Sequence, residues 1–298
     1  MHPAVLTKGL TKRYRERVGI DQLDLEVQPG EVFGFIGPNG AGKTTTIRLL
    51  LDLLHPTSGS AQVFGLDTRR NSVAIRRMVG YLPGDFGLDT RLTGRQLLTY
   101  FGRLRGMSDL GKAPELAKRI GLDLDLHMGR MSRGNRQKVG LVQALYHEPQ
   151  LLILDEPTTG LDPLVQDTFL QILVEAKDAG RTIFLSSHIL SEVERVCDRV
   201  AIVRKGKLAT LETTETLLEK TRKRVTMLFT EPVDASVFKK LPGVSELQVQ
   251  GRAITLRLDD GVDAVVKEAA RHSLVDMNMA HPTLDEVFMG YYEDEADE

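Results

Sequence analysis

The chain has 298 residues, enough for one large domain or two smaller ones, and its 41% hydrophobic and 27% charged residues are typical of a globular protein. Its formal net charge of -2 argues neither for nor against nucleic acid binding. The single cysteine, Cys197, excludes an internal disulfide and a cysteine metal cluster, which favours a reducing compartment and a buried apolar role for this residue. We see no signal peptide and no apolar run of about 20 residues, so we expect any membrane contact to come from a partner.

The N-terminal part predicts a strand, a glycine-rich loop and a helix in that order. Apolar and acidic residues alternate over residues 20–27, which predicts a half-exposed strand. A buried strand is expected at 32–36, and it leads directly into a glycine-rich segment at 37–42. Apolar residues at helical spacing follow, from Ile47 to Leu54.

Residues 37–44 read GPNGAGKT and fit the pattern G-x-x-x-x-G-K-[ST] of a phosphate-binding loop. Glycines let such a backbone curl until its N–H groups form a nest for anionic oxygens, and the following helix adds positive partial charge. We expect Lys43 to reach the β- and γ-phosphates of ATP and Thr44 to place its hydroxyl on Mg²⁺. The predicted ATP-binding residues of this loop are Gly37, Pro38, Asn39, Gly40, Ala41, Gly42, Lys43, Thr44 and Thr45.

Further along the chain, strands and helices alternate. Residues 91–148 predict mainly helices with a basic surface, which we interpret as a solvated face. Strands are expected at 151–154, 182–186 and 200–203, with helices between them. This alternation implies an α/β fold with a mostly parallel sheet covered by helices.

After about residue 221 the pattern changes to short alternating segments. The order strand, helix, strand, strand, helix, strand predicts a small α+β ferredoxin-like domain over 221–298. Its function is open: it is either a stabilising or dimer-supporting appendage or a regulatory domain. The acidic end, EDEADE, is expected to be a frayed tail without a role.

Two consecutive carboxylates, Asp155 and Glu156, end the aliphatic strand at 151–154. Ligands of open α/β sheets bind beyond the carboxyl ends of the strands. Asp155 therefore suits Mg²⁺ or its waters, and Glu156 can polarise a water for attack on the γ-phosphate. The alternative is that one of the two only caps a helix or loop, which the phosphate loop in the same chain makes the weaker interpretation.

With these motifs in this order, residues 1 to about 220 resemble an ABC (ATP-binding cassette) ATPase. Residues 131–137, MSRGNRQ, resemble the family's signature loop, with its Ser and second Gly at Ser132 and Gly134. The resemblance implies that these residues, with Asn135, bind the γ-phosphate of ATP held by the opposite subunit, although Ser132 is also suited to cap a helix. It also implies a P-loop NTPase (RecA-like) core at 1–220 with a helical subdomain at about 86–148.

Three more residues match the family's pattern. Asp162, in TTGLDP, resembles the loop that links two active sites, and His188, in SSH, resembles the switch histidine that contacts the γ-phosphate and the attacking water. Catalysis is thus assigned to Glu156, His188 and Lys43. Tyr14 matches the aromatic residue that stacks on adenine.

One loop departs from the family's pattern. Where the family has a glutamine that touches Mg²⁺ and couples ATP to the membrane domains, this chain has Gly84 and Asp85. Asp85 is a candidate metal ligand, but a carboxylate cannot donate the hydrogen bonds of an amide. The LPGD sequence here, the arginine at 133 and the C-terminal PTLDEVF followed by two tyrosines resemble exporter cassettes that pair with ABC-2 type membrane subunits.

The resemblance implies an ATPase, with ATP and Mg²⁺ as cofactors, that energises transport, in the direction of export, through a separate polytopic ABC-2 type membrane subunit. Two cassettes, either two copies or a copy and a homologue, would sandwich ATP on the cytoplasmic face of the cell membrane. The helical segment near 86–105 is the candidate docking surface. We expect no nucleic acid partner.

Three alternatives stay open. The first is a soluble ABC ATPase that acts on nucleic acid or ribosomes, but the chain has no second cassette, long coiled coil or zinc-binding cysteines. The second is an importer ATPase. The third is a regulatory module without turnover, against which Asp155, Glu156 and His188 argue.

Overall fold

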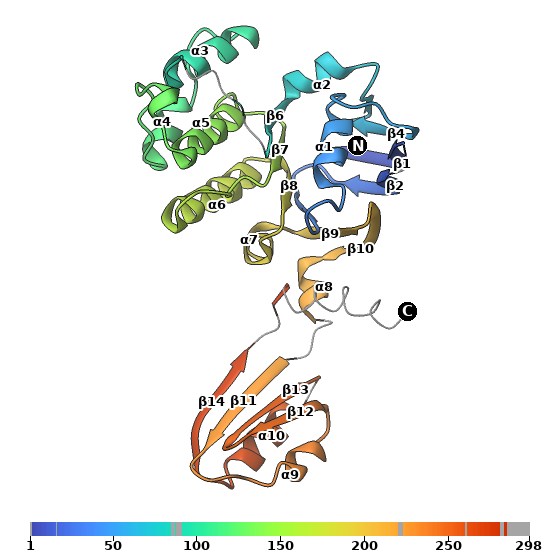
Figure 1. Cartoon of the computed structure of the whole chain (residues 1–298), viewed down its shortest axis with the longest axis vertical. Helices are drawn as coiled ribbons and strands as arrows, with labels where there is room; N and C mark the ends of the chain where they lie inside the picture. The colour runs from blue at the N-terminus through green and yellow to red at the C-terminus, as the bar shows by residue number, and fades with distance from the viewer. Residues whose placement is uncertain are drawn as a thin grey trace. The chain divides into compact units, whose positions relative to one another are not determined.

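A computed structural model describes residues 2–15, 17–84, 87, 91–219, 223–259, 261–280 and 283–284 of the chain. Contacts within the chain define two units, Met1–Thr213 and Thr214–Glu298 (Figure 1). Among the helices of the described residues, none combines the length and the apolar character needed to span a bilayer. The functional boundary near residue 220 stays a prediction.

A six-stranded sheet in the order β10-β9-β3-β8-β7-β6 forms the centre of the first unit. All neighbouring strands are parallel except β10 and β9, which pair antiparallel. The mostly parallel α/β core predicted from the sequence is therefore confirmed. The strands are β3 (Val32–Ile36), β6 (Val79–Leu82), β7 (Leu151–Asp155), β8 (Thr182–Ser187), β9 (Arg199–Arg204) and β10 (Lys207–Thr213).

The three central strands β3, β7 and β8 are buried along their entire length. Strands that are covered on both faces, here by helices and by a second sheet, need apolar side chains at every position, which explains their continuous rather than alternating apolar sequences. The carboxyl ends of these parallel strands meet at one edge of the sheet. The phosphate loop, Asp155 and His188 all follow at that edge.

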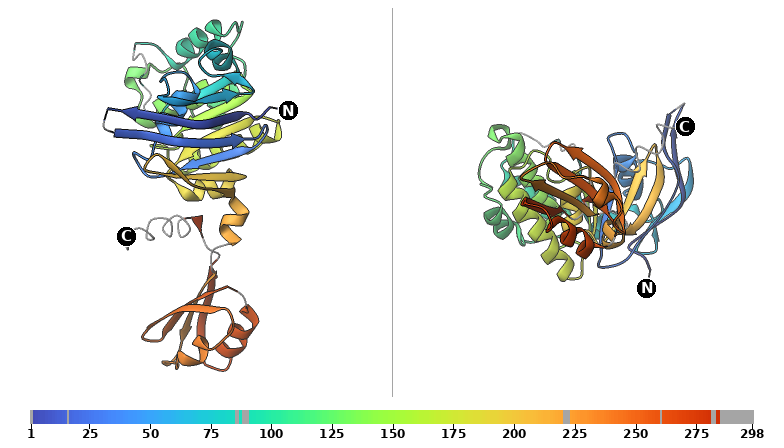
Figure 2. Two further views of the ribbon diagram at one scale, coloured as in Figure 1. Left: turned by 90° about the vertical axis from the view of Figure 1, so that its right-hand side faces the viewer. Right: turned by 90° about the horizontal axis from the view of Figure 1, so that it is seen from below.

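A second sheet, antiparallel and in the order β2-β1-β4-β5, completes the first unit. Its two long strands, drawn in dark blue, run side by side in the left view of Figure 2. Its apolar face joins a common core with the central sheet, in which Val5 and Leu25 pack with Phe33 and Phe35. The strands are β1 (Val5–Tyr14), β2 (Arg17–Val27), β4 (Ser58–Val63) and β5 (Leu66–Asp67).

The helices of the first unit fall into two groups. Three of them, drawn in green in Figure 1, lie together between β6 and β7 in the sequence: α3 (Gly94–Leu104), α4 (Ala113–Arg119) and α5 (Arg133–Leu145), with a short 3₁₀ turn at Met128–Arg130. Thr93 and Gln96 form a reciprocal capping box that starts α3. The others are α1 (Lys43–Leu50), α2 (Ser72–Met78), α6 (Pro163–Asp178) and α7 (Leu190–Val196).

The second unit begins with α8 (Thr214–Glu219) and contains one antiparallel sheet in the order β12-β13-β11-β14. Alternate apolar side chains of the sheet, such as Val225, Met227 and Phe229, form a separate core with Phe238 of α9. Element order and sheet order agree with the predicted ferredoxin-like fold. The elements are β11 (Lys223–Phe229), α9 (Ser236–Lys239), β12 (Val244–Gln250), β13 (Ala253–Leu258), α10 (Val262–Ala269) and β14 (Leu274–Ala280).

Candidate functional site

The phosphate loop connects the end of β3 to the start of α1, as the sequence predicts. Gly42 adopts a φ of 111°, and a Cβ there would lie 2.6 Å from the carbonyl oxygen of Gly19. A Cβ at Gly37 would lie 2.3 Å from the carbonyl oxygen of Val203. These glycines are required because the loop passes this close to neighbouring backbone.

Lys43 is buried, with only 6% of its surface exposed, and its ammonium group points back over the loop. Nζ donates hydrogen bonds to the carbonyl oxygens of Gly37, at 2.5 Å, and Pro38, at 3.3 Å. It also lies 3.2 Å from Oε1 of Glu156. The positive charge is thus held at the mouth of the loop, where phosphate oxygens would bind.

Asp155 is 1% exposed at the end of β7, and both of its carboxylate oxygens accept hydrogen bonds. The Thr44 hydroxyl donates to Oδ2 at 2.8 Å, and the Ser186 hydroxyl donates to Oδ1 at 2.5 Å. Burial of a carboxylate is tolerated when it is hydrogen-bonded in this way. Ser186 was not predicted as a site residue, although two serines at the end of an apolar strand are a usable signal.

The donor set around Thr44 and Asp155 fits Mg²⁺. A hydroxyl and a carboxylate lie in contact beside a phosphate loop, and Mg²⁺ is commonly held by one or two such oxygens together with phosphates and water. Within the described residues, no group of three or more His, Cys, Asp or Glu side chains forms a metal cage.

Glu156 lies between Lys43 and His188. Its Oε1 faces the Lys43 ammonium, and its Oε2 shares a short hydrogen bond with Nδ1 of His188. Its φ of 51° lies in the left-handed region, which is uncommon for a residue with a Cβ. The structure therefore brings the three predicted catalytic residues together.

Two titratable groups border this cluster. Burial, with a smaller contribution from the Asp155 charge, raises the pKa of Tyr81 to about 12. Burial also raises the pKa of Glu192, whose Oε2 accepts a hydrogen bond from Thr158 at 2.9 Å. Both pKa shifts disfavour additional negative charge beside Asp155 and Glu156.

A cavity of about 520 Å³ opens over the phosphate loop. Tyr14 lines it with a ring that is 41% exposed, as expected for a residue that stacks on a base. The Lys12 ammonium lies 5.3 Å from the centre of this ring. Arg17, Val18 and Arg48 also line the cavity and were not predicted.

The signature-loop residues do not line this cavity. Ser132 caps α5, where its hydroxyl oxygen accepts a hydrogen bond from the Asn135 N–H at 3.2 Å. Gly134 lies against the backbone of Gly160, and Asp162 caps α6 by accepting from the Val165 N–H at 3.1 Å. One chain alone therefore does not combine the phosphate loop with the signature loop.

The loop with Gly84 and Asp85, which departs from the family's pattern, is only partly covered by the described residues. A Cβ at Gly84 would lie 3.3 Å from Oδ2 of Asp155, so the backbone here passes close to this carboxylate. Asp85 lies outside the described residues, and its role as a metal ligand stays a prediction. Most of the C-terminal motif at 282–288 and the tyrosines at 291 and 292 also lie outside them.

Comparison with known proteins decides the family. The model of the ABC transporter family matches residues 20–159. The chain is 34% identical over 294 residues to the bacitracin transport ATP-binding protein BcrA of Bacillus licheniformis, across 93% of this chain and 96% of the relative. This chain belongs to the ABC transporter ATP-binding proteins. The resemblance inferred from the motifs is thus confirmed.

Further comparisons agree with this assignment. The cassette is 34% identical over 310 residues to the daunorubicin/doxorubicin resistance ATP-binding protein DrrA of Streptomyces peucetius, across 99% of this chain and 94% of the relative. A solved ATP-binding subunit of an ABC transporter matches with a TM-score of 0.68 and 32% identity, across 72% of this chain and 91% of that one. The protein is an ATPase subunit that powers transport. None of these relatives supports a soluble role on nucleic acid or ribosomes.

Proposed function

We propose that this cassette drives export by hydrolysing ATP between two head-to-tail cassettes, with Mg²⁺ bound by Thr44 and Asp155. The dimer is inferred from the separation of the two loops within one chain. Lys43 lines the cavity, whereas Ser132 and Gly134 are not among its lining residues. A partner cassette would supply these residues. The export direction rests on similarity to two proteins that are named for bacitracin transport and drug resistance.

Each residue has a defined task in this proposal. The loop N–H groups and Lys43 bind the phosphates, and Tyr14 stacks on adenine. Mg²⁺ would neutralise charge on the β- and γ-phosphate oxygens. Glu156 orients and polarises the attacking water, while His188 holds Oε2 of Glu156 and so keeps the carboxylate aimed at the γ-phosphate. Positioning and charge neutralisation supply most of the rate enhancement, because phosphoryl transfer needs little covalent work from protein.

ATP binding would close the dimer because the triphosphate contacts both cassettes only in the closed form. Loss of phosphate would remove those contacts and allow the dimer to reopen. Asp162 follows Gly160, whose backbone lies against Gly134 of the signature loop in the same chain, and we propose that it links the two sites.

A mixing experiment tests whether the partner supplies Ser132. Lys43→Ala and Ser132→Arg should each be inactive as homodimers. In a mixed dimer one site carries both changes and the other carries neither. If the two variants assemble at random, half of the dimers are mixed, and each mixed dimer has one intact site out of two. We therefore expect recovery of about a quarter of the wild-type ATPase rate. If the mixture recovers no ATPase activity although thermal unfolding shows that both variants are folded, Ser132 acts in the site of its own chain and the proposed arrangement is refuted.

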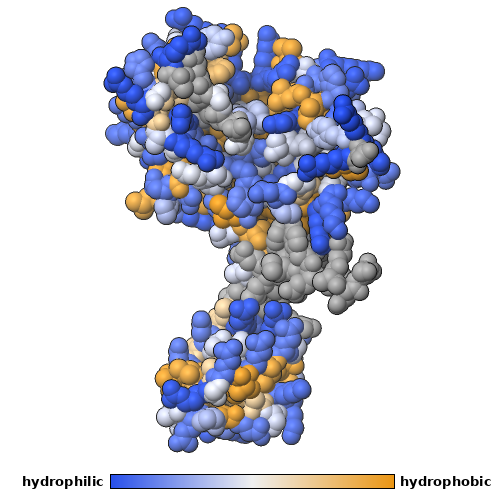
Figure 3. Space-filling model, viewed as in Figure 1, coloured by the Kyte–Doolittle hydropathy of each residue, from blue (hydrophilic) through white to orange (hydrophobic). Residues whose placement is uncertain are grey.

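We also propose that a polytopic ABC-2 type membrane subunit docks in a groove beside α3 and thereby holds the cassette at the cytoplasmic face of the membrane. The groove has a volume of about 270 Å³, and its lining is mainly apolar, with Leu51, Leu53 and Phe101. Nearby, Tyr100 is 57% exposed and Leu104 is 66% exposed. Figure 3 shows apolar surface next to α2 on this face. A short apolar helix or loop of the partner fits this lining.

The docking test uses the tagged full chain and detergent-solubilised membranes. We expect a polytopic membrane protein to co-purify in stoichiometric amount, and Leu53→Asp to abolish its recovery. Val174→Asp, a change at a 40% exposed position on α6, is the matched control and should retain it. Equal recovery with both variants would remove the groove from the interface, and recovery of nucleic acid or ribosomal proteins instead would overturn the transporter partner.

The second unit is proposed to be an accessory domain over residues 221–298. Its separate apolar core supports independent packing, since Phe229 and Phe238 are buried within the unit itself.

A further inference from the structure

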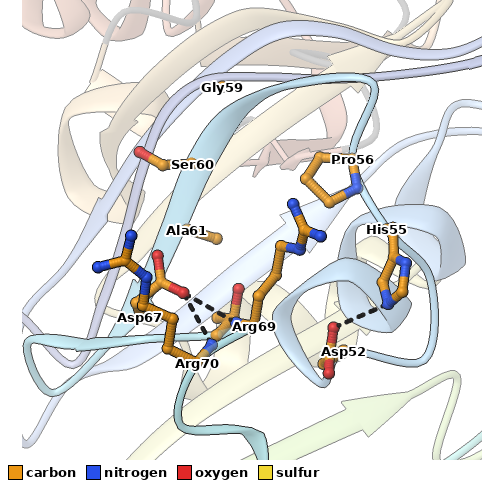
Figure 4. Close-up of a pocket in the computed structure, with 10 residues that line it drawn as sticks. Asp52, His55, Pro56, Gly59, Ser60, Ala61, Asp67, Arg69 and Arg70 are labelled. Carbon is orange, nitrogen blue, oxygen red and sulfur yellow. Dashed lines mark hydrogen bonds and ion pairs between the residues drawn. The ribbon is translucent and has the colours of Figure 1, made fainter.

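A second cavity of about 580 Å³ lies on the N-terminal sheet and shares no lining residue with the cavity over the phosphate loop. It is formed by the turn after α1, by β4 and by the segment that follows β5 (Figure 4). We call it the arginine cavity. The lining residues that matter for its chemistry are Asp52, His55, Ser60, Thr68, Arg69 and Arg70.

Hydrogen-bond donors without partners dominate this lining. In the part of the chain that the structure describes, the guanidinium groups of Arg69 and Arg70 have neither an ion pair nor a side-chain hydrogen bond. Figure 4 shows them on opposite sides of the cavity. The hydroxyls of Thr68 and Ser60 likewise have no hydrogen-bond partner among the same residues, so both can donate to a ligand in the cavity.

Neither of the two carboxylates of the lining pairs with a guanidinium group in the part of the chain that the structure describes. Oδ1 of Asp67 accepts the backbone N–H groups of Arg69, at 3.1 Å, and Arg70, at 2.9 Å. Oδ1 of Asp52 lies 3.4 Å from Nε2 of His55 and is buried without a hydrogen-bond partner. The guanidinium charges of Arg69 and Arg70 therefore stay available to a ligand.

Two lysines add positive charge next to the arginine cavity. Lys8 pairs with Ser60 across β1 and β4, so the two side chains project from the same face of the sheet. The Lys12 ammonium donates a hydrogen bond to the carbonyl oxygen of His55 at 2.7 Å. Four basic side chains and two carboxylates thus lie in or next to the cavity, and this excess of positive charge favours anions.

We propose that the arginine cavity binds the phosphate group of a phosphate ester, held between Arg69 and Arg70 with hydrogen bonds from Thr68 and Ser60. Guanidinium groups bind phosphate oxygens in bidentate fashion, which suits a ligand placed between two of them. With a volume of about 580 Å³, the arginine cavity has room for the group attached to the phosphate of an ester as well as for the phosphate itself. This chemistry is shared by soluble phosphate esters and by anionic phospholipid headgroups.

The experiment measures the binding of a soluble phosphate ester and of a phospholipid headgroup to the full chain, after ADP has filled the nucleotide site. Glycerol 3-phosphate is titrated by calorimetry, and co-sedimentation is measured with vesicles of phosphatidylglycerol in phosphatidylcholine against phosphatidylcholine alone. We expect Arg69→Gln/Arg70→Gln to weaken binding at least tenfold. Arg77→Gln/Lys118→Gln removes the same charge at exposed positions outside both cavities and should bind like the wild type.

The outcomes separate the sources and test the site. Binding of glycerol 3-phosphate that the double arginine variant loses assigns a soluble ester, and binding to phosphatidylglycerol vesicles alone assigns a lipid headgroup. Absence of binding to either probe, or equal weakening in both double variants, would overturn the proposal. The ATPase rate of the Arg69→Gln/Arg70→Gln variant should equal that of the wild type, so this test is independent of the proposed export cycle.

Discussion

The Thr44 hydroxyl donates a hydrogen bond to the Asp155 carboxylate, with 2.8 Å between Oγ1 and Oδ2, across 111 positions of the chain. This contact joins the helix after the phosphate loop to the strand that carries the acidic pair. It also brings together the two oxygen ligands proposed for Mg²⁺. On this proposal, a change at either residue should lower the Mg²⁺-dependent ATPase rate more than it lowers the stability of the fold.

Thr44→Ala should lower the Mg²⁺-dependent ATPase rate by at least about 100-fold, because it removes a metal ligand and the hydrogen bond that orients Asp155. Thr44→Ser keeps the hydroxyl and should retain most of the rate. Turnover as a function of Mg²⁺ concentration, with ATP binding measured separately, is the decisive comparison. If alanine and serine gave the same rate, Thr44 would not hold the metal.

Glu156→Gln should bind ATP but hydrolyse it at least about 100-fold more slowly, because an amide cannot take up a proton from the attacking water. The side chain keeps its size, so the φ of 51° and the contacts with Lys43 and His188 are disturbed little. Glu175→Gln changes an exposed carboxylate that pairs with Arg119 and serves as the control. Wild-type turnover in Glu156→Gln would refute the role of this residue.

Ser186→Ala should reduce the free energy of unfolding by about 2 kcal/mol, the usual cost of losing a hydrogen bond to a charged group. In this variant the buried Oδ1 of Asp155 loses the hydrogen bond that the Ser186 hydroxyl donates. Urea unfolding of the full chain measures the loss. Ser58→Ala, at an exposed strand position, should change stability by much less, and an equal effect at the two serines would show that the Asp155 contact is not stabilising.

His147 should make stability depend on pH between about 6.5 and 4. Burial, together with the positive charge of Arg105, lowers the pKa of His147 to about 4 in the folded state. The unfolded chain then binds a proton that the folded chain does not, so stability decreases as the pH falls through this window, by at most about 3 kcal/mol.

The measurement for His147 is urea unfolding at several pH values. His147→Gln should flatten the decrease below pH 6.5, because glutamine does not titrate. His127→Asn changes an exposed imidazole and should leave the decrease in place. A wild-type pH profile in the His147 variant would assign the effect to other groups.

The sequence predicts those helices and strands whose own residues show a clear apolar pattern. The strands β3, β7 and β8 are continuous apolar runs, and α6 shows clear helical periodicity. By contrast, β1, β4 and β5 were missed. Positive φ at Gly9 and several register shifts interrupt the pairing of β1, so its apolar residues do not alternate cleanly. These strands form because of their partners in the sheet rather than because of their own sequences.

By itself, the sequence determined the phosphate loop and the acidic pair at Asp155 and Glu156, because backbone curvature and strand ends are set by neighbouring residues. Only the tertiary structure placed Ser186 on Asp155, set Glu156 between Lys43 and His188, and opened the arginine cavity. Each of these contacts joins side chains from separate elements. Their positions follow from strand order and packing, and no local pattern of residues encodes those relationships.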